Sequence, residues 1–267
     1  MSRIRETFAR LGREATTGVA SFLTVGFPDK DSTMPLLKAM VDGGADFIEL
    51  GVPFSDPLAD GATIQRASQV ALENGVTLAD CLDVCAEARG QYADTPILMM
   101  GYYNPILSYG VERFTREGAQ AGLDGLIVAD IPPEEAGPLR QACVAAGIDL
   151  VFLLAPTSTD ERIQRVCDAS LSLIYCVSLT GVTGARKELA PGLPKFLARV
   201  RRWTNLPLVV GFGISTRAHV ESVGRYAESV VVGSALIELI DRSPPSRRCR
   251  RVREYLGELT GSGVLQA

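Results

Sequence analysis

The stretch FIELGVPFSDPLADG, Phe47 to Gly61, joins two contrasting kinds of sequence. It begins with an apolar run that contains one acid, Glu49, and it continues as a segment rich in Pro, Gly and Asp. A continuous apolar run is typical of a strand that is covered on both faces, as in a parallel sheet. The stretch therefore predicts a buried parallel strand, followed by a loop that ends beside a second acid, Asp60.

Apolar runs of this kind recur along the whole chain of 267 residues and alternate with helical patterns. The predicted strands are 20–26, 46–51, 96–101, 125–130, 149–154, 172–177, 207–213 and 229–234. Eight strands that alternate with helices predict an α/β fold, a (β/α)8 TIM barrel that forms a single domain over residues 1–267. An extra N-terminal helix over 2–13 is expected to cap the bottom of the barrel. An open doubly wound sheet is the alternative, but no GxGxxG motif follows the first strand.

Composition places the chain among globular proteins, with 46% hydrophobic and 22% charged residues. The net charge of −4 argues against a general affinity for nucleic acid. No apolar run reaches the roughly 18 residues of a membrane span, and the N-terminus lacks the apolar core of a signal peptide. The six cysteines lie mostly in apolar, periodic segments, which favours free thiols in a reducing cytoplasm.

Several kinds of catalytic chemistry lack the residues that they need. The only histidine, His219, is predicted to be an exposed helix residue, so neither a zinc nor an iron site of the usual kind is expected. None of the four lysines lies in a predicted strand, and Lys187 is the only one in a candidate active-site loop. A Schiff-base lysine in the barrel mouth is therefore not expected.

Carboxylates remain as candidates for acid–base chemistry. Glu49 lies in a predicted buried strand, and the strands offer no basic partner, so its pKa is expected to be raised to the range of a proton donor near neutral pH. Asp60 precedes a glycine, a pattern that on its own indicates a turn. Asp130 ends the strand GLIVAD, where orienting the next loop is as reasonable a role as catalysis.

Glycine-rich strand ends predict a phosphate site. GFGIS (211–215) follows the seventh strand and VVGSA (231–235) follows the eighth, where barrels often bind phosphate through backbone N–H groups. The long connection after the sixth strand contains a further pair, Gly181 and Gly184. The residues thus predict a barrel enzyme that acts on a phosphorylated substrate with carboxylates.

Longer motifs make the chain similar to a known family. FIELGVPFSDPLADG followed by TIQRA, then GYYNPI, DGLIVADIPPEE, LLAPTST, SLTGVTGAR and GFGIS resemble the tryptophan synthase alpha subunit family, in order and over nearly the whole chain. The resemblance implies reversible aldol cleavage of indole-3-glycerol phosphate to indole and glyceraldehyde 3-phosphate. The indole ring, once protonated at C3, would serve as the electron sink.

The resemblance also implies roles for individual residues. Glu49 matches the acid–base residue that protonates indole C3, and Asp60 matches the acid that stabilises the charge at the indole N–H. The residues that match the substrate pocket are Phe22, Met100, Tyr102, Tyr175, Thr183 and Phe212, with Ala129 and Leu153 as weaker matches. The residues that match the phosphate end are Gly184, Gly213, Gly233 and Ser234.

A partner is implied as well. Members of the family work in an alpha2-beta2 assembly with a beta subunit that carries pyridoxal phosphate, while the alpha chain itself needs no cofactor or metal. The loop Pro53 to Asp60 and the Pro132-Pro133 corner would face this partner. The alternatives are a free-standing indole-3-glycerol phosphate lyase and a non-catalytic barrel that only activates a partner. The basic segment RSPPSRRCRRVREYLGEL is interpreted as a helix that packs on the barrel rather than as a nucleic-acid site.

Overall fold

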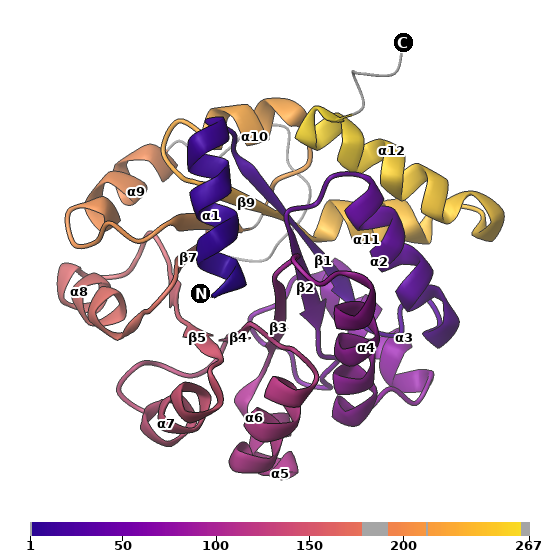
Figure 1. The fold of residues 1–267 in the computed structure, drawn as a ribbon, viewed down its shortest axis with the longest axis horizontal. Helices are drawn as coiled ribbons and strands as arrows, with labels where there is room; N and C mark the ends of the chain where they lie inside the picture. Colours follow the sequence, from indigo (N-terminus) through magenta and orange to yellow (C-terminus); the bar gives the residue numbers. More distant parts are fainter. Residues whose placement is uncertain (1, 178–191, 212, 263–267) are drawn as a thin grey trace.

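The computed structural model describes residues 2–177, 192–211 and 213–262, and within them parallel strands form a barrel surrounded by helices (Figure 1). The strands are β1 Gly18–Thr24, β2 Phe47–Gly51, β3 Ile97–Gly101, β4 Gly125–Val128, β5 Asp149–Val151, β6 Leu153–Leu154, β7 Ile174–Val177, β8 Leu208–Gly211 and β9 Ser229–Val232. Each hydrogen-bonded strand pair is parallel, and the order is β5-β4-β3-β2-β1-β9-β8-β7-β6. The predicted TIM barrel is confirmed.

The predicted strand 149–154 appears as two short strands, β5 and β6, on either side of Phe152. β5 pairs with β4, whereas β6 pairs with β7, so this one stretch of chain links the two ends of the strand order and closes the barrel. The backbone of Phe152 still takes part, since its carbonyl accepts a hydrogen bond from the Tyr175 N–H at 3.3 Å. The nine observed strands therefore correspond to the eight predicted ones.

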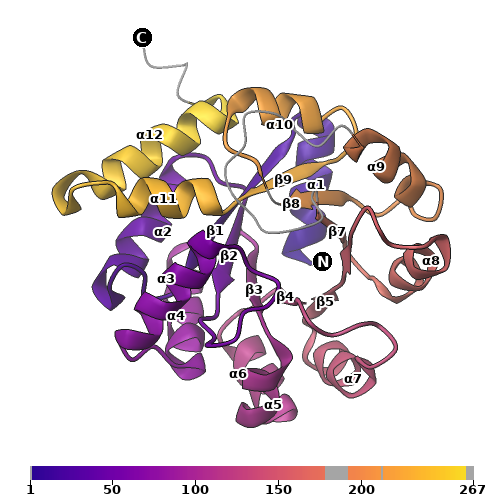
Figure 2. The same ribbon diagram turned by 180° about the vertical axis from the view of Figure 1, so that it is seen from behind.

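Helices cover the outside of the barrel (Figures 1 and 2). They are α1 Arg3–Glu14, α2 Thr33–Asp42, α3 Ala62–Glu73, α4 Leu78–Gln91, α5 Tyr103–Tyr109, α6 Val111–Gln120, α7 Gly137–Ala146, α8 Asp160–Ala169, α9 Leu193–Arg201, α10 Arg217–Val223, α11 Ser234–Asp241 and α12 Arg248–Thr260, with short 3-10 turns η1 Lys30–Ser32 and η2 Pro245–Arg247. The strands are almost wholly buried because the helices cover their outer faces, which explains their continuous apolar sequence.

The first helix, α1, closes the barrel at the end where the strands begin, as predicted for residues 2–13. Its buried face meets the first residues of three strands: Leu11 lies beside Gly18, Ile4 beside Gly125, and the Phe8 ring lies 5.0 Å from the Phe47 ring. This contact leaves the opposite end, where the strands finish, for the loops that carry the candidate site. Figure 2 is viewed from that opposite end, with α1 behind the strands.

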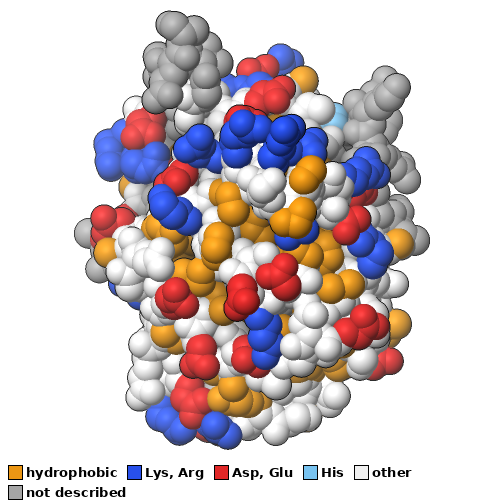
Figure 3. Space-filling model, turned by 90° about the vertical axis from the view of Figure 1, so that its right-hand side faces the viewer, with side chains coloured by type: hydrophobic (Ala, Val, Ile, Leu, Met, Phe, Trp, Pro, Cys, Tyr) orange, Lys and Arg blue, Asp and Glu red, His pale blue; other side chains and the backbone are white. Residues whose placement is uncertain are grey.

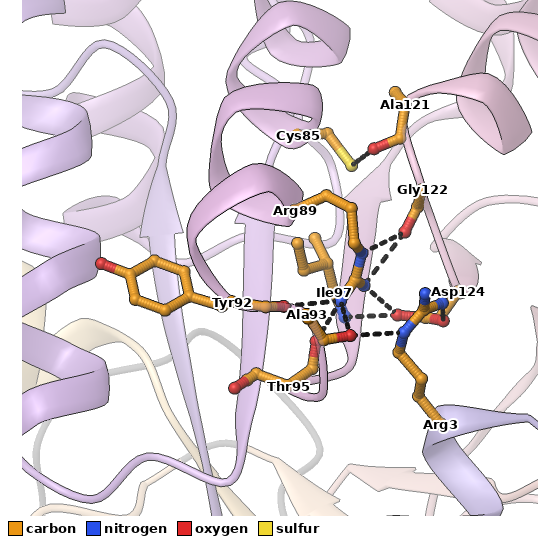
Figure 4. A network of polar contacts seen from close by, with 10 residues as sticks. All are labelled: Arg3, Cys85, Arg89, Tyr92, Ala93, Thr95, Ile97, Ala121, Gly122 and Asp124. Atoms are coloured by element: carbon orange, nitrogen blue, oxygen red, sulfur yellow. Dashed lines mark hydrogen bonds and ion pairs between the residues drawn. The ribbon is translucent and has the colours of Figure 1, made fainter.

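A buried ion-pair network ties the start of β4 to its neighbours (Figure 4). The Asp124 carboxylate is bound by the Arg89 guanidinium and, at 2.9 Å, by Arg3 from α1, and it also accepts the N–H of Ile97. Arg89 itself donates to the carbonyls of Tyr92, Ala93, Thr95 and Gly122. One arginine thus satisfies the carbonyls around the start of two strands, where an uncompensated buried charge would be costly.

The basic C-terminal segment forms α12, as predicted. Val252 and Leu256 are buried, and Leu256 lies against the backbone of Gly43 at the end of α2. Lys and Arg side chains gather toward the upper edge of the face shown in Figure 3. The segment is therefore a solvated helix that packs on the barrel, consistent with its interpretation from the sequence.

The cysteines and the histidine lie as follows. All six cysteines are free, and all except Cys249 are buried, as expected for core residues. The prediction for His219 was wrong: it is 6% exposed, because it shares the inner face of α10 with Val220 and Val223. Its Nδ1 accepts a hydrogen bond from the Ser215 N–H at 3.3 Å, so it supports the loop after β8 from behind.

Candidate active site

A cavity opens at the end of the barrel where the strands finish, opposite α1. It encloses about 520 Å³ of space between its atoms, solvent at its mouth included. Its lining comes from the strands β1, β2, β3, β7 and β9, from the connection between β2 and α3 with the start of α3, and from the segments after β8 and β9. The lining residues are Phe22, Glu49, Asp60, Ile64, Met100, Tyr175, Gly213, Ile214, Val231, Gly233, Ser234 and Ala235. In TIM barrels this end is where active sites lie.

Glu49 projects from the middle of β2 into the floor of this cavity. In the sheet it lies level with Phe22 of β1 and Leu98 of β3, so its neighbours on both sides are apolar. Its side chain is buried (2% of the residue is exposed), and among the described residues nothing forms a hydrogen bond with its Oε1. Burial, followed by the negative charge of Asp60, raises the pKa of Glu49 to about 8. Glu49 therefore holds a proton at neutral pH, as the sequence predicts.

Asp60 reaches the same cavity from the loop that joins β2 to α3, residues 52–61, which we call loop two. The backbone around it is fixed, because its N–H donates to the Pro57 carbonyl at 3.0 Å and its carbonyl accepts from Gln65 Nε2 at 2.9 Å. Burial raises the pKa of Asp60 to about 6, and a hydrogen bond from Tyr102 acts in the opposite direction. At neutral pH Asp60 is thus an anion while Glu49 is neutral, which is the division of labour of an acid and an electrostatic stabiliser.

The walls of the cavity are aromatic and apolar. Tyr175 on β7 is buried, and burial, with smaller contributions from Glu49 and Asp60, raises its pKa well above the usual range. The hydroxyl of Tyr175 packs against Gly211, where a Cβ atom would lie only 2.5 Å from it. Phe22 and Met100 form part of the remaining wall. A flat aromatic ligand fits such a lining.

The opposite side of the cavity is built for an anion. Gly233 is the N-cap of α11, and Ser234 and Ala235 are in its first turn, so their N–H groups have no carbonyl of the helix to pair with. Gly213 has a left-handed φ of +82°, a backbone conformation that only glycine adopts without strain. Backbone N–H groups at a helix N-terminus bind phosphate well.

The structure brings together most of the residues that the sequence singles out. Glu49, Asp60, Phe22, Met100, Tyr175, Gly213, Gly233 and Ser234 all line the cavity. Tyr102 instead lines a small neighbouring cavity with Asp60 and Met100. Ala129 and Leu153 pack against the hydrophobic core and do not line the main cavity. Asp130 accepts the N–H of Tyr103 at 2.9 Å, so it orients the chain after β3. Thr183, Gly184 and Phe212 lie outside the described residues.

Four lining residues were not assigned individually by the sequence analysis: Ile64, and also Ile214, Val231 and Ala235, which lie within the two predicted phosphate motifs. Val231 was predictable, because strand alternation places it on the same inner face as Gly233. Ile214 and Ala235 adjoin predicted phosphate-end residues. Nothing in the sequence around Ile64 predicts that it lines the cavity. It does so because α3 begins directly after loop two. Within the described residues, no group of three His, Cys, Asp or Glu side chains could hold a metal ion.

Known proteins match this chain over nearly its whole length. The family model described as "Tryptophan synthase alpha chain" matches residues 8–260. A tryptophan synthase alpha chain of Roseiflexus sp. (strain RS-1) is 54% identical over 98% of this chain and 100% of its own length. The tryptophan synthase of Saccharomyces cerevisiae is 45% identical over 97% of this chain, which corresponds to 37% of that longer protein.

Solved structures agree with these sequence matches. Tryptophan synthase subunit alpha from Legionella pneumophila str. Paris superposes with a TM-score of 0.91 at 32% identity, covering 99% of both chains. A chain of Mycobacterium tuberculosis tryptophan synthase gives a TM-score of 0.89 at 36% identity and covers 100% of this chain and 99% of that one.

Proposed function

Because this chain belongs to the tryptophan synthase alpha chain family, we propose that Glu49 is the acid–base residue of the family's reaction and that Asp60 stabilises the charge that develops at the indole N–H. The reaction is the reversible aldol cleavage of indole-3-glycerol phosphate to indole and D-glyceraldehyde 3-phosphate, a carbon–carbon lyase step of L-tryptophan biosynthesis. The observation that supports the assignment is the pair of carboxyl groups in one apolar cavity, one with a pKa of about 8 and the other with a pKa of about 6.

In the proposed mechanism the neutral Glu49 donates its proton to C3 of the indole ring. The ring nitrogen becomes positively charged, and the Asp60 carboxylate stabilises it by accepting the N–H. The bond from C3 to the glycerol carbon then breaks, and its electron pair returns to the ring as indole forms. The hydroxyl on that carbon becomes the aldehyde carbonyl, and its proton passes to the Glu49 carboxylate, which restores the starting state.

The remaining walls orient the substrate in this proposal. The indole ring lies among Phe22, Met100 and Tyr175, and the phosphate lies at the start of α11, against the N–H groups of Ser234 and Ala235. Thr183, Gly184 and Phe212 complete the site by resemblance to the family. The substrate brings its own electron sink in the indole ring, so the proposal assigns no cofactor or metal to this chain.

We further propose a tryptophan synthase beta subunit as the partner, in an alpha2-beta2 assembly, with pyridoxal phosphate on the beta subunit and indole passed between the two. Loop two is the segment that would face this partner by resemblance to the family, and it presents Leu58, which is 94% exposed. Within the described residues, no helix is long and apolar enough to cross a membrane. Together with the free thiols, this finding supports a cytoplasmic location, which we also propose.

The experiment is an indole-release assay on indole-3-glycerol phosphate with the purified chain, with and without a beta subunit. Glu49→Gln is expected to lower kcat by about 10²- to 10⁴-fold at unchanged KM, and Asp60→Asn to lower it strongly as well. Glu117→Gln on the outside of α6 is the control for loss of a carboxylate. Activity of Glu49→Gln within a few-fold of the parent would refute the assignment. Full activity without any beta subunit would instead favour a free-standing lyase.

A further inference from the structure

We propose that Tyr102 is a positioning residue that holds the Asp60 carboxylate, and with it the end of loop two, at the cavity. This inference rests on the proposed role of Asp60. It gives Tyr102 a different task from the one implied by resemblance, which was to line the substrate pocket.

The hydroxyl of Tyr102 contacts two consecutive residues of loop two. It accepts the backbone N–H of Ala59 at 3.0 Å. Tyr102 also lines the same small cavity as Asp60, where hydrogen bonding from its hydroxyl lowers the pKa of the Asp60 carboxyl. A phenol has a single proton, and the Ala59 N–H is itself a donor, so the phenol proton is available for the carboxylate. The tyrosine therefore donates to Asp60 and favours its ionised form.

Tyr102 is itself well anchored to the barrel. It directly follows β3 and is only 4% exposed. The next residue, Tyr103, donates its N–H to Asp130 at 2.9 Å, which fixes the chain at this point. The Tyr102 ring also packs on Phe54 at the start of loop two, with 5.3 Å between ring centroids. One side chain of the rigid barrel thus contacts loop two near both of its ends.

The position of Tyr102 separates this role from direct contact with the substrate. Tyr102 lines a small cavity that adjoins the main one and shares Asp60 and Met100 with it, and it is not among the residues that line the main cavity. Its effect on the reaction must therefore pass largely through Asp60. A side chain that contacts a reacting group in this way holds that group in its productive geometry.

Other charged or titratable groups also face Asp60. Glu49 approaches from β2 and Tyr175 from β7, while the charge of Asp130 acts on Tyr102 rather than on Asp60. At neutral pH Glu49 and Tyr175 are neutral, so neither stabilises a negative charge on Asp60 by an opposite charge. Among the described residues, the Tyr102 hydroxyl is the group whose contact lowers the pKa of Asp60.

The test is Tyr102→Phe, which keeps the ring against Phe54 and removes only the hydroxyl. A lost hydrogen bond to a charged group predicts a fall of about 10- to 100-fold in kcat/KM for indole release. The acid limb of the pH profile of kcat/KM is expected to move to higher pH. Tyr109→Phe is the matched control, because its hydroxyl also binds a carboxylate, Glu117, but on the outer surface of α6. That variant should leave both the rate and the acid limb unchanged.

A second comparison tests whether Tyr102 acts through Asp60. In an Asp60→Asn background, Tyr102→Phe should lower the rate by no more than about twofold further, since no carboxylate remains to be held. An undiminished loss in that background, or an acid limb that does not move, would overturn the proposal. Neither result would touch the proposed function, which fails only if the parent chain does not release indole or if Asp60→Asn keeps full activity.

Replacement of Tyr102 by 3-fluorotyrosine keeps the proposal testable if Tyr102→Phe does not fold. The fluorinated phenol is a stronger donor of nearly the same shape, so it should move the acid limb to lower pH, opposite to the effect of phenylalanine. A limb that stays in place with a folded fluorotyrosine protein would contradict the donated hydrogen bond.

Discussion

The carboxyl groups of Glu49 and Asp60 line the same cavity, and the negative charge of Asp60 adds to burial in raising the pKa of Glu49 to about 8. Asp60 itself has a pKa of about 6. The two groups reach this arrangement from different structures, because one lies on a rigid strand and the other at the end of a loop. Their different charge states at neutral pH follow mainly from burial, to which the charge of Asp60 adds at Glu49 and which the Tyr102 hydroxyl opposes at Asp60.

The first prediction concerns the pH dependence of indole release. Cleavage needs a protonated Glu49 and an ionised Asp60, so kcat/KM should be bell-shaped, falling below about pH 6 and above about pH 8. Because the two groups interact, these apparent values belong to the pair. Measurement of kcat/KM across this range tests the prediction. A rate that continues to rise above pH 9 would show that Glu49 does not act as the proton donor.

The second prediction concerns the stability cost of Glu49. Its pKa rises from 4.5 in the unfolded chain to about 8 in the folded chain, so the unfolded state binds fewer protons between these values and stability falls as pH rises. Glu49→Gln cannot ionise and escapes this cost. Its melting temperature relative to the parent should therefore increase from pH 5 to pH 8 and then level off. A difference that is independent of pH would contradict the raised pKa, whatever its effect on activity.

Much of this arrangement was predictable, for a physical reason. Strands that are buried on both faces must be continuously apolar, so they stand out in the sequence, and an acid such as Glu49 in one of them is conspicuous. Contacts between segments that are distant in the chain produce no comparable pattern in the sequence. The hydrogen bond of Tyr102 to loop two, the burial of His219 and the entry of Ile64 into the cavity all depend on how distant elements meet in the barrel. The Asp-Gly pattern at Asp60 indicates only a turn, so the family resemblance was needed to identify Asp60 as a candidate catalytic residue.

The third prediction concerns the network around Arg89 at the opposite end of the barrel (Figure 4). Removal of one partner from a buried ion pair costs about 3–5 kcal/mol, because the other charge is left uncompensated. Arg89→Leu should therefore lower the free energy of unfolding by up to this amount, since Asp124 keeps only the partly exposed Arg3 as an ionic partner and the carbonyls that Arg89 binds lose their donor. Urea unfolding measures the change.

The control for this prediction is Lys38→Ala, which removes an exposed ion pair with Asp42 within α2. Exposed pairs contribute about 0–1 kcal/mol, so this variant should be nearly as stable as the parent. If Arg89→Leu and Lys38→Ala had similar small effects, the network around Arg89 would not contribute to the stability of the barrel.

The fourth prediction concerns the tip of loop two. Leu58 is 94% exposed, while the chain that follows it is held by the contacts of Ala59 and Asp60. Because loop two faces the partner in the proposed assembly, Leu58 is expected to be buried there by the beta subunit. Leu58→Ser should weaken binding to a beta subunit by at least about tenfold, as for an interface residue that loses its burial.

This variant should leave the free energy of unfolding of the isolated chain unchanged, because Leu58 has almost no contacts to lose. Tyr226→Ser is the matched control, since Tyr226 is also exposed but lies just before β9, at the end of the barrel opposite loop two. Calorimetric titration of the two variants with a beta subunit separates the possibilities. Equal affinity for both variants would place the partner on another surface, whereas weakened binding of Leu58→Ser alone would locate it on loop two, directly above Asp60.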